Sequence, residues 1–206
     1  MPIKAVVFDI GGVLEFNPDT GWRKKWQERL HLSIEDLDQR LKDMGRDGSL
    51  GTCSEAEWLD GLCEITGIDQ GQADDFMKDL WEEYVGTLNV ELASFFSNLR
   101  PRYQTAILSN SFIGARDREE SLYHFEEMTD LIVYSHEVGL AKPDRRIYAL
   151  TCERLGVRPE EMVFLDDLTA NIAAAHEFGI HGILFTETSQ AIADVRACLQ
   201  MNGAGH

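Results

Sequence analysis

An acidic residue ends an aliphatic run near the start of the chain, in VVFDIGGVL at residues 6–14. The residues before Asp9 are typical of a buried strand, and Gly11 and Gly12 favour a turn directly after it. Asp9 is therefore expected where a strand ends and a loop begins, which is the edge at which open α/β sheets bind ligands. Taken alone, Asp9 is better explained as a turn cap.

Other aliphatic runs also end in polar or charged residues, in AILSNS, in the segment YSHEVGLAKPD and in VFLDDL. The residues concerned are Ser109, Asn110, Lys142, Asp166 and Asp167. Each has an ordinary explanation as a turn former, a surface lysine or a helix N-cap. Because the carboxyl ends of parallel strands share one edge of a sheet, we expect all of these side chains to meet beside Asp9.

Acidic side chains gathered in this way require a cation. Each close pair among Asp9, Asp166 and Asp167 would repel by about 4 kcal/mol at an effective dielectric constant of about 20. Carboxylates with a backbone oxygen are hard ligands, and a site with so few protein groups suits Mg²⁺ better than Ca²⁺. Lys142 would balance the remaining charge and hold a phosphate or the nucleophile.

The periodicity of the chain indicates the elements that position these residues. From residue 89 onward, aliphatic runs alternate with helical patterns, which predicts an α/β fold with a parallel sheet and helices on both faces. Residues 17–85 show only helical spacing, with a capping box at Ser54 and Glu57. We therefore predict a core domain of residues 1–16 and 86–206 and a helical domain of residues 17–85 placed over Asp9. Its own core would contain Trp26, Leu30, Leu59, Leu62 and Trp81.

Composition limits the classes of partner. The 206 residues are 44% hydrophobic and carry a formal net charge of −17, so the surface should repel nucleic acids and anionic lipid. The four cysteines show no CxxC spacing, and no apolar run has the length of a signal sequence or a membrane span. These features predict a cytoplasmic protein with reduced thiols. The acidic surface also repels small phosphates, so any phosphate site would have to supply its own positive charge.

Two segments of residues 17–85 have alternative interpretations. The basic cluster WRKKWQER is typical of a solvated helix face, and the alternative is that Arg23 or Lys24 faces the site and binds an anionic substrate. The glycines of RDGSLGTCSEAEW, residues 46–58, suit a loop that approaches the site, although the segment can equally be a helix connection.

The motifs FDIGGVL, ILSNS, AKPD and VFLDD occur in the order and strand-end context of the haloacid dehalogenase superfamily, which the chain resembles. SHEVGLAKPDRRIY followed by FLDDLTANI is most similar to the subgroup of small sugar-phosphate phosphatases and the phosphatase half of soluble epoxide hydrolase. The resemblance implies a Rossmann-like core and an inserted α-helical cap that closes over a small phosphorylated substrate.

The resemblance also implies roles for the residues already named. Asp9 would attack phosphorus and form an aspartyl-phosphate. Mg²⁺ would be held by Asp9, the carbonyl oxygen of Gly11 and Asp167, with Asp166 either near the metal or paired with the lysine. The hydroxyl of Ser109 and the backbone amide of Asn110 would bind phosphoryl oxygens, and Lys142 would neutralise charge on the nucleophile and the phosphate.

The chain departs from the pattern at Gly11, where most phosphatases of the superfamily carry a second aspartate that protonates the leaving group. Such general acid catalysis is worth about 10²- to 10⁴-fold. We predict a phosphatase that uses another donor, for which Glu15, Asp19 and His136 are candidates. The alternatives are a metal-independent 2-haloacid dehalogenase, whose halide leaves without a proton, and a non-catalytic binding protein. The identity of the substrate and the oligomeric state do not follow from the sequence.

Overall fold

The computed structural model describes residues 1–201, and its centre is a five-stranded sheet in which every neighbouring pair is parallel. The α/β fold predicted from the alternating pattern is confirmed. From one edge to the other the strands are β5 (Leu131–Tyr134), β4 (Gln104–Ser109), β1 (Ala5–Phe8), β6 (Met162–Asp166) and β7 (His181–Leu184). The strand that ends at Asp9 is thus central, and the strands with the other sequence-predicted groups flank it.

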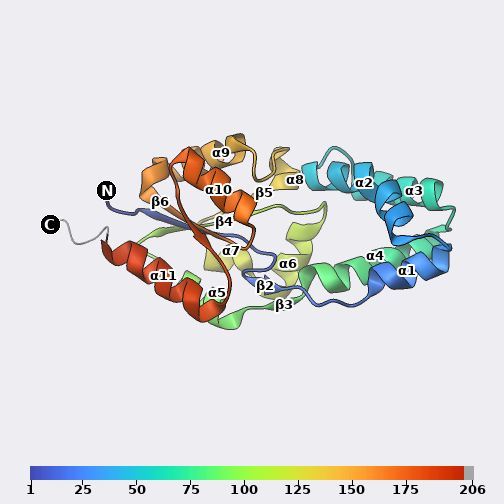
Figure 1. Cartoon of the computed structure of the whole chain (residues 1–206), viewed down its shortest axis with the longest axis horizontal. Coiled ribbons are helices and arrows are strands. Elements are labelled where there is room, and N and C mark those ends of the chain that lie inside the picture. Colours follow the sequence, from blue (N-terminus) through green and yellow to red (C-terminus); the bar gives the residue numbers. More distant parts are fainter. Residues whose placement is uncertain (202–206) are drawn as a thin grey trace.

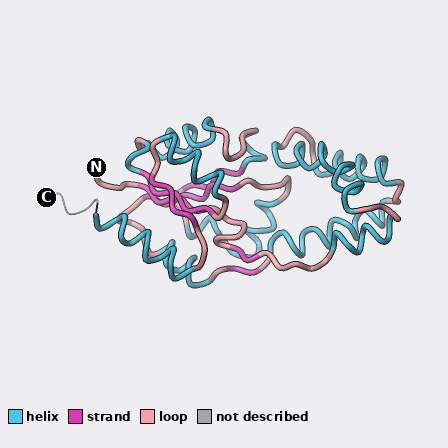
Figure 2. The backbone as a smooth tube through the Cα atoms, viewed as in Figure 1, coloured by secondary structure: helices cyan, strands magenta, loops and turns pink. Residues whose placement is uncertain are grey.

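Helices cover both faces of the sheet (Figures 1 and 2). One face packs against α9 (Arg145–Leu155) and α10 (Thr169–Phe178), and the other against α5 (Val90–Ser97), α7 (Phe125–Met128) and α11 (Thr188–Met201). The short elements α6 (Ala115–Tyr123), α8 (Ser135–Val138) and the 3₁₀ turn η1 (Pro159–Glu161) complete the core. None of the helices within residues 1–201 has both the length and the apolar character needed to cross a membrane.

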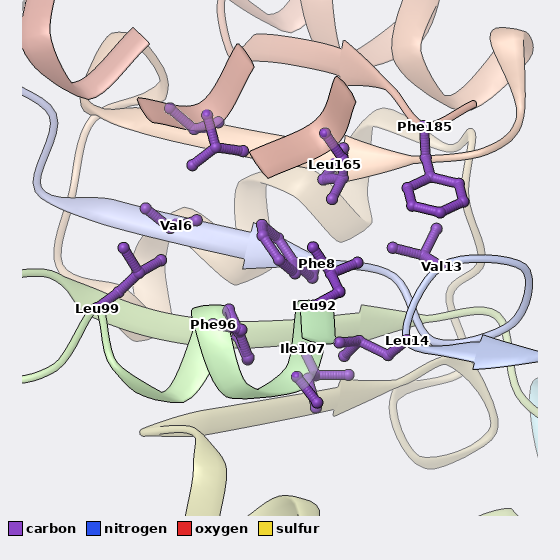
Figure 3. Close-up of a cluster of buried hydrophobic side chains, with 14 of the residues drawn as sticks. Val6, Phe8, Val13, Leu14, Leu92, Phe96, Leu99, Ile107, Leu165 and Phe185 are labelled. Atoms are coloured by element: carbon purple, nitrogen blue, oxygen red, sulfur yellow. The ribbon is translucent and has the colours of Figure 1, made fainter. Parts of the chain in front are cut away.

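Alternate residues of β1 point to opposite faces of the sheet, as the geometry of a strand requires. Val6 and Phe8 enter the cluster shown in Figure 3, where the Phe8 ring stacks on Phe96 of α5 with the ring centroids 4.6 Å apart. Ala5 and Val7 pack on the other face, against α9 and α10. Because β1 is buried on both faces, the end of the strand at Asp9 is held rigidly.

The helical region is a separate lobe at one end of the molecule (Figure 1). It consists of α1 (Trp22–Leu30), α2 (Ile34–Leu50), α3 (Glu55–Thr66) and α4 (Gln70–Val85), and the predicted capping box at Ser54 and Glu57 is present at the start of α3. The chain enters and leaves this lobe through a short antiparallel ribbon of β2 (Glu15–Phe16) and β3 (Thr87–Leu88). We propose that this ribbon divides the core domain from the cap, in agreement with the ranges inferred from periodicity.

The cap has its own apolar core, and part of the main domain packs against it. Trp26, Leu62 and Trp81 are buried there, while Leu30 and Leu59 lie partly buried at its margin. Phe112, Ile113 and Ala115, which follow β4, belong to the same cluster. The cap is therefore docked on the core domain by apolar contact close to the catalytic edge.

The C-terminal end of α2 makes the polar part of this docking. The backbone amide of Ile113 donates to the carbonyl oxygen of Gly48 at 3.0 Å, and Ser135 Oγ donates to the carbonyl oxygen of Ser49 at 2.7 Å. A Cβ atom at Gly51, where φ is +65°, would lie 1.8 Å from the carbonyl oxygen of His136. The expectation that residues 46–58 form a loop is wrong in part, because α2 extends to Leu50 and α3 begins at Glu55.

Candidate active site

The sequence-predicted residues meet at the carboxyl edge of the sheet. Asp9 follows β1, Ser109 ends β4, and Asp166 ends β6 with Asp167 directly after it. Lys142 lies in the loop after α8, which follows β5. Because these strands are parallel and adjacent, their carboxyl ends converge, as the order of the motifs predicts.

Lys142 is the positive charge at this edge. Its ammonium Nζ lies 2.7 Å from Asp9 Oδ1 and 2.7 Å from Asp166 Oδ2, and its side chain is completely buried. A buried ammonium is stable only when it is paired and hydrogen-bonded, and here one lysine bridges two carboxylates. This arrangement orients Asp9 and keeps positive charge beside the atom that would attack a substrate.

The side chain of Asn110 positions Lys142. Its Oδ1 accepts from the backbone amide of Lys142 at 2.7 Å, and its Nδ2 donates to the backbone carbonyl of Lys142 at 2.8 Å. Sequence reasoning considered only the backbone amide of Asn110. The two contacts join segments 32 residues apart in the chain, so no local pattern indicates them.

Both oxygens of Asp166 are occupied by hydrogen bonds. Oδ1 accepts from the backbone amide of Leu168 at 2.8 Å and from Asn171 Nδ2 at 3.0 Å, while Oδ2 accepts from Lys142 and from Asn171. Asn171, in the first turn of α10, was not identified from the sequence. With its oxygens shared among these donors, Asp166 is arranged as the partner of Lys142.

The three aspartates fit a divalent cation. Asp9, Asp166 and Asp167 each offer a carboxylate oxygen, and these oxygens lie within 4.8 Å of one another. Burial raises the pKa of Asp9 to about 7 against the opposing effect of Lys142, and burial followed by the charge of Asp166 raises the pKa of Asp167. The lysine alone does not compensate this negative charge. The residues that would complete the cation site are Asp9, Asp167 and the carbonyl of Gly11.

Glycines make room for this arrangement. A Cβ atom at Gly12 would lie 2.3 Å from Asp167 Oδ2, so a larger residue at this position would displace the carboxylate. The Gly12 amide donates to Asn17 Oδ1 at 3.1 Å, and Asn17 Nδ2 donates to the carbonyl oxygens of Glu83, at 3.2 Å, and of Tyr84. The loop that follows Asp9 is thereby tied to the last turn of α4 in the cap.

Mg²⁺ is expected to stabilise the folded protein through this cluster. A ligand that binds only the folded state at tenfold excess over its Kd raises the free energy of unfolding by about 1.4 kcal/mol. We expect the Tm to rise with added MgCl₂, to return to its starting value with EDTA, and to respond little in Asp167→Asn. The exposed Asp74 of α4 provides the matched control, Asp74→Asn, which should respond as the wild type does. Equal responses in the two variants would contradict the site.

Two further acids are buried near the edge, and neither is exposed at all. Both oxygens of Glu15 lack a hydrogen-bond partner, and burial with the charge of Glu119 raises the pKa of Glu15 to about 10. Glu119 accepts from the hydroxyl of Tyr134, and burial raises the pKa of Glu119 to about 7. Glu15 was considered as a proton donor from the sequence, whereas Glu119 was not identified because its helix shows no distinguishing pattern.

A cavity of about 950 Å³ is lined mostly by residues of the cap and reaches the core domain at the segment that follows β4. On the core side it is lined by Asn110, Ser111 and Phe112, and on the cap side by aromatic, apolar and charged residues. The charged lining residues are Arg23, Glu35, Asp38, Lys42 and Glu83. Of the two basic residues considered from the sequence, Arg23 lines the cavity and pairs with Asp38, while Lys24 is exposed and is absent from the lining. The cavity is mixed in charge and open to water, which suits a polar metabolite.

Comparisons with known proteins identify the family of the chain. The family of haloacid dehalogenase-like hydrolases matches residues 3–179, and the chain belongs to this family. The chain is 26% identical over 214 residues to bifunctional epoxide hydrolase 2 of Sus scrofa, covering 95% of this chain but only 38% of that protein. It is 25% identical over 188 residues to the D-ribitol-5-phosphate phosphatase of Bacteroides thetaiotaomicron, covering 86% and 89% of the two chains.

A solved structure has the same fold. A HAD family enzyme from Bacteroides thetaiotaomicron, in complex with magnesium and inorganic phosphate, matches with a TM-score of 0.74 at 22% identity, covering 89% of this chain and 94% of that chain. The relatives also include (S)-2-haloacid dehalogenase 1 of a Pseudomonas species, 30% identical over 124 residues that cover 60% of this chain and 52% of that protein. The chain is therefore a HAD-like hydrolase with both phosphatases and dehalogenases among its relatives.

Proposed function

We propose that this hydrolase is a Mg²⁺-dependent phosphomonoesterase that acts on a small phosphorylated metabolite. The observation that carries the proposal is the ammonium of Lys142, held 2.7 Å from both Asp9 and Asp166, with Asp167 beside them. A cluster with this excess of negative charge needs a divalent cation, and a bound cation with a lysine attracts a phosphoryl group. The phosphatase relative from Bacteroides supports the same reaction class.

The nucleophile is Asp9. Its carboxylate attacks phosphorus, the bond from phosphorus to the leaving oxygen breaks, and an aspartyl-phosphate forms that water then hydrolyses. The backbone amide of Ile10 donates to Asp9 Oδ1 at 2.8 Å and Lys142 holds the same atom, so the other oxygen is left for the reaction. Mg²⁺ held by Asp9, Asp167 and the carbonyl of Gly11 would neutralise phosphoryl charge.

The phosphoryl oxygens are bound by the segment that ends β4. Ser109 is almost fully buried there, and Asn110 borders the cavity. We assign the Ser109 hydroxyl and the backbone amide of Asn110 to these oxygens, with Lys142 on the side of the nucleophile. Phosphoryl transfer needs little covalent help from the protein beyond the nucleophile, so the placement of these donors supplies much of the catalysis.

Hydrolysis of p-nitrophenyl phosphate by the full chain, with MgCl₂ or with EDTA, tests the reaction class. We expect turnover that needs the metal and that falls by about 10³-fold or more in Asp9→Asn, because the amide is a poor nucleophile. Asp60→Asn, at an exposed position of α3, is the matched control and should keep full activity. A panel of phosphorylated metabolites then identifies the substrate.

The same assay separates the alternatives. Halide release from 2-haloacids in EDTA, with no phosphate release, would show a dehalogenase and overturn the proposal. Ligand binding without turnover of either substrate class would show a non-catalytic protein. Phosphate release that is unaffected by both EDTA and Asp9→Asn would equally end the assignment of Asp9 and the metal.

A further inference from the structure

The proposed phosphatase lacks a side chain at Gly11 to protonate the leaving oxygen, and the cavity is lined on the core side by Ser111, which is hydrogen-bonded to His136 behind it. Ser111 Oγ lies 2.6 Å from His136 Nδ1, a short hydrogen bond between a hydroxyl and an imidazole. Ser111 follows directly after Asn110 and lines the cavity with it. Ser111 is therefore next to the segment assigned to the phosphoryl oxygens, and it lines the same cavity as residues of the cap.

The pair is built into the contact between core and cap. The backbone amide of Ser111 donates to Ser135 Oγ at 2.9 Å, and Ser135 Oγ donates in turn to the carbonyl oxygen of Ser49 in the cap. Gly51 leaves room for the backbone of His136, because a Cβ atom at Gly51 would lie 1.8 Å from the His136 carbonyl oxygen. Docking of the cap thus fixes both the loop that carries Ser111 and the helix that carries His136.

The environment of His136 suits proton exchange. Its ring is half-buried and lies 5.5 Å from the ring of Tyr134, centroid to centroid. The charged groups that act on it are Glu137 on its own helix and Arg116 and Asp117 on α6, while α2 presents backbone atoms from the cap. Burial lowers the pKa of His136 below its ordinary value, so the imidazolium releases its proton readily and the neutral ring is available to accept one.

We propose that Ser111 donates the proton to the leaving oxygen and that His136 replaces it, so that this pair does the work of the aspartate absent at position 11. This inference rests on the proposed phosphatase function. Ser111 is the catalytic residue of the pair, because its hydroxyl would touch the substrate. His136 acts through Ser111 and is a positioning and proton-exchange residue.

The proton balance closes over the two half-reactions. In the first, Asp9 bonds to phosphorus as the ester oxygen departs with its electron pair. That oxygen takes the Ser111 hydroxyl proton while the imidazolium of His136 returns one to Ser111. In the second, water attacks the aspartyl-phosphate and frees the Asp9 carboxylate, and the proton that water loses passes through Ser111 to neutral His136. The products are an alcohol and inorganic phosphate, and the imidazolium is restored.

The other candidate donors are enclosed or engaged elsewhere. Glu15 and Glu119 have no exposed surface. Asp19 caps the turn before α1 by accepting from the Gly21 amide at 3.0 Å. A general acid must be within hydrogen-bond reach of the leaving atom, directly or through one water. Ser111 directly follows the two residues assigned to the phosphoryl oxygens and lines the cavity.

Leaving-group dependence tests the inference. We propose measuring kcat/KM with MgCl₂ for phosphate monoesters from 2,4-dinitrophenyl phosphate to simple alkyl phosphates, between pH 5 and 9. Ser111→Ala and His136→Gln are expected to lose about 10²-fold or more on alkyl esters and less than about threefold on the dinitrophenyl ester, whose leaving group needs no proton. With alkyl esters the wild-type rate should fall as pH rises above the pKa of His136, and His136→Gln should lose this decline.

Rescue and control variants separate a proton donor from a structural residue. A Cβ atom at Gly11 meets nothing closer than Asn17 Oδ1 at 3.6 Å, so Gly11→Asp fits and should restore alkyl ester hydrolysis in the Ser111→Ala protein. Ser94→Ala on α5 and His176→Gln on α10 lie away from the cavity and should keep the wild-type dependence.

The outcomes that overturn the inference differ from those that overturn the proposed function. A wild type that hydrolyses alkyl phosphates, with variants whose leaving-group dependence is unchanged or whose loss is uniform across esters, would overturn the proton relay and leave the phosphatase intact. A wild type that hydrolyses no phosphate ester would overturn both. Because His136→Gln leaves the residues of the phosphate-binding loop themselves unchanged, it gives an answer even if Ser111→Ala folds poorly.

Discussion

Replacement of Lys142 by methionine is expected to lower the free energy of unfolding by about 3–5 kcal/mol in the absence of metal, and to abolish turnover. The fully buried ammonium lies 2.7 Å from each of two carboxylates, so its removal leaves Asp9 and Asp166 uncompensated. The pKa of Asp9, already raised to about 7 by burial, would rise further because the charge and hydrogen bond of Lys142 oppose that shift. Urea unfolding at pH 7.5 in EDTA measures the first effect, and p-nitrophenyl phosphate hydrolysis with MgCl₂ the second.

A double variant distinguishes loss of charge balance from loss of packing. Lys142→Met combined with Asp166→Asn removes one positive and one negative charge, and it should recover much of the stability while turnover stays absent. Lys78→Met, at an exposed position of α4, is the matched control and should change stability by less than about 0.5 kcal/mol. A Lys142→Met protein with the stability of the wild type would contradict the role of this ion pair.

Much of the core domain could be predicted from the sequence because its strands are short aliphatic runs separated by helical patterns. The run before Asp9 and the run before Asp166 are continuous rather than alternating, which is typical of strands buried on both faces of a parallel sheet. The ribbon of β2 and β3 was not predicted, since each strand has only two residues and their pairing joins segments on either side of the cap. Periodicity is not informative at that length.

The residues of the candidate site were likewise predicted only in part. Strand ends carried the information that placed Asp9, Lys142 and Asp166 at a common edge. The groups that orient them come from other segments, such as Asn110 on the backbone of Lys142 and Asn171 on Asp166. The first of these pairs depends on how closely two loops approach, which is set by sheet packing rather than by local spacing.

The raised pKa of Glu15 could not be predicted from the sequence for a different reason, because its main cause is burial. Glu15 follows Leu14 and is the first residue of β2, and Phe16 is the second. A two-residue strand does not indicate from its sequence which residue faces inward, and in the structure the polar Glu15 is buried while Phe16 is exposed. In the structure both of its oxygens are buried without a partner, near Glu119. A carboxylate in this position would bear the full cost of desolvation, and the neutral acid is therefore the form that the fold accepts.

Glu15→Gln is expected to stabilise the protein at alkaline pH. The pKa of Glu15 is about 10 in the folded state against 4.5 for an unperturbed glutamate, so between these values the unfolded chain releases a proton that the folded chain keeps. Each pH unit in that window favours unfolding by up to about 1.4 kcal/mol. The contribution of Glu15 is therefore most favourable below pH 4.5 and declines as pH rises towards 10.

Glutamine has nearly the same shape and no titrating proton, so the variant should lack this decline. We expect similar stabilities at pH 5 and an advantage for Glu15→Gln of up to about 4 kcal/mol at pH 8, measured by urea unfolding across this range. The exposed Glu153 of α9 provides the control, since Glu153→Gln should follow the wild-type pH dependence. Parallel pH curves for Glu15→Gln and the wild type would show that Glu15 is already ionised in the folded protein, with a cation or water compensating its charge.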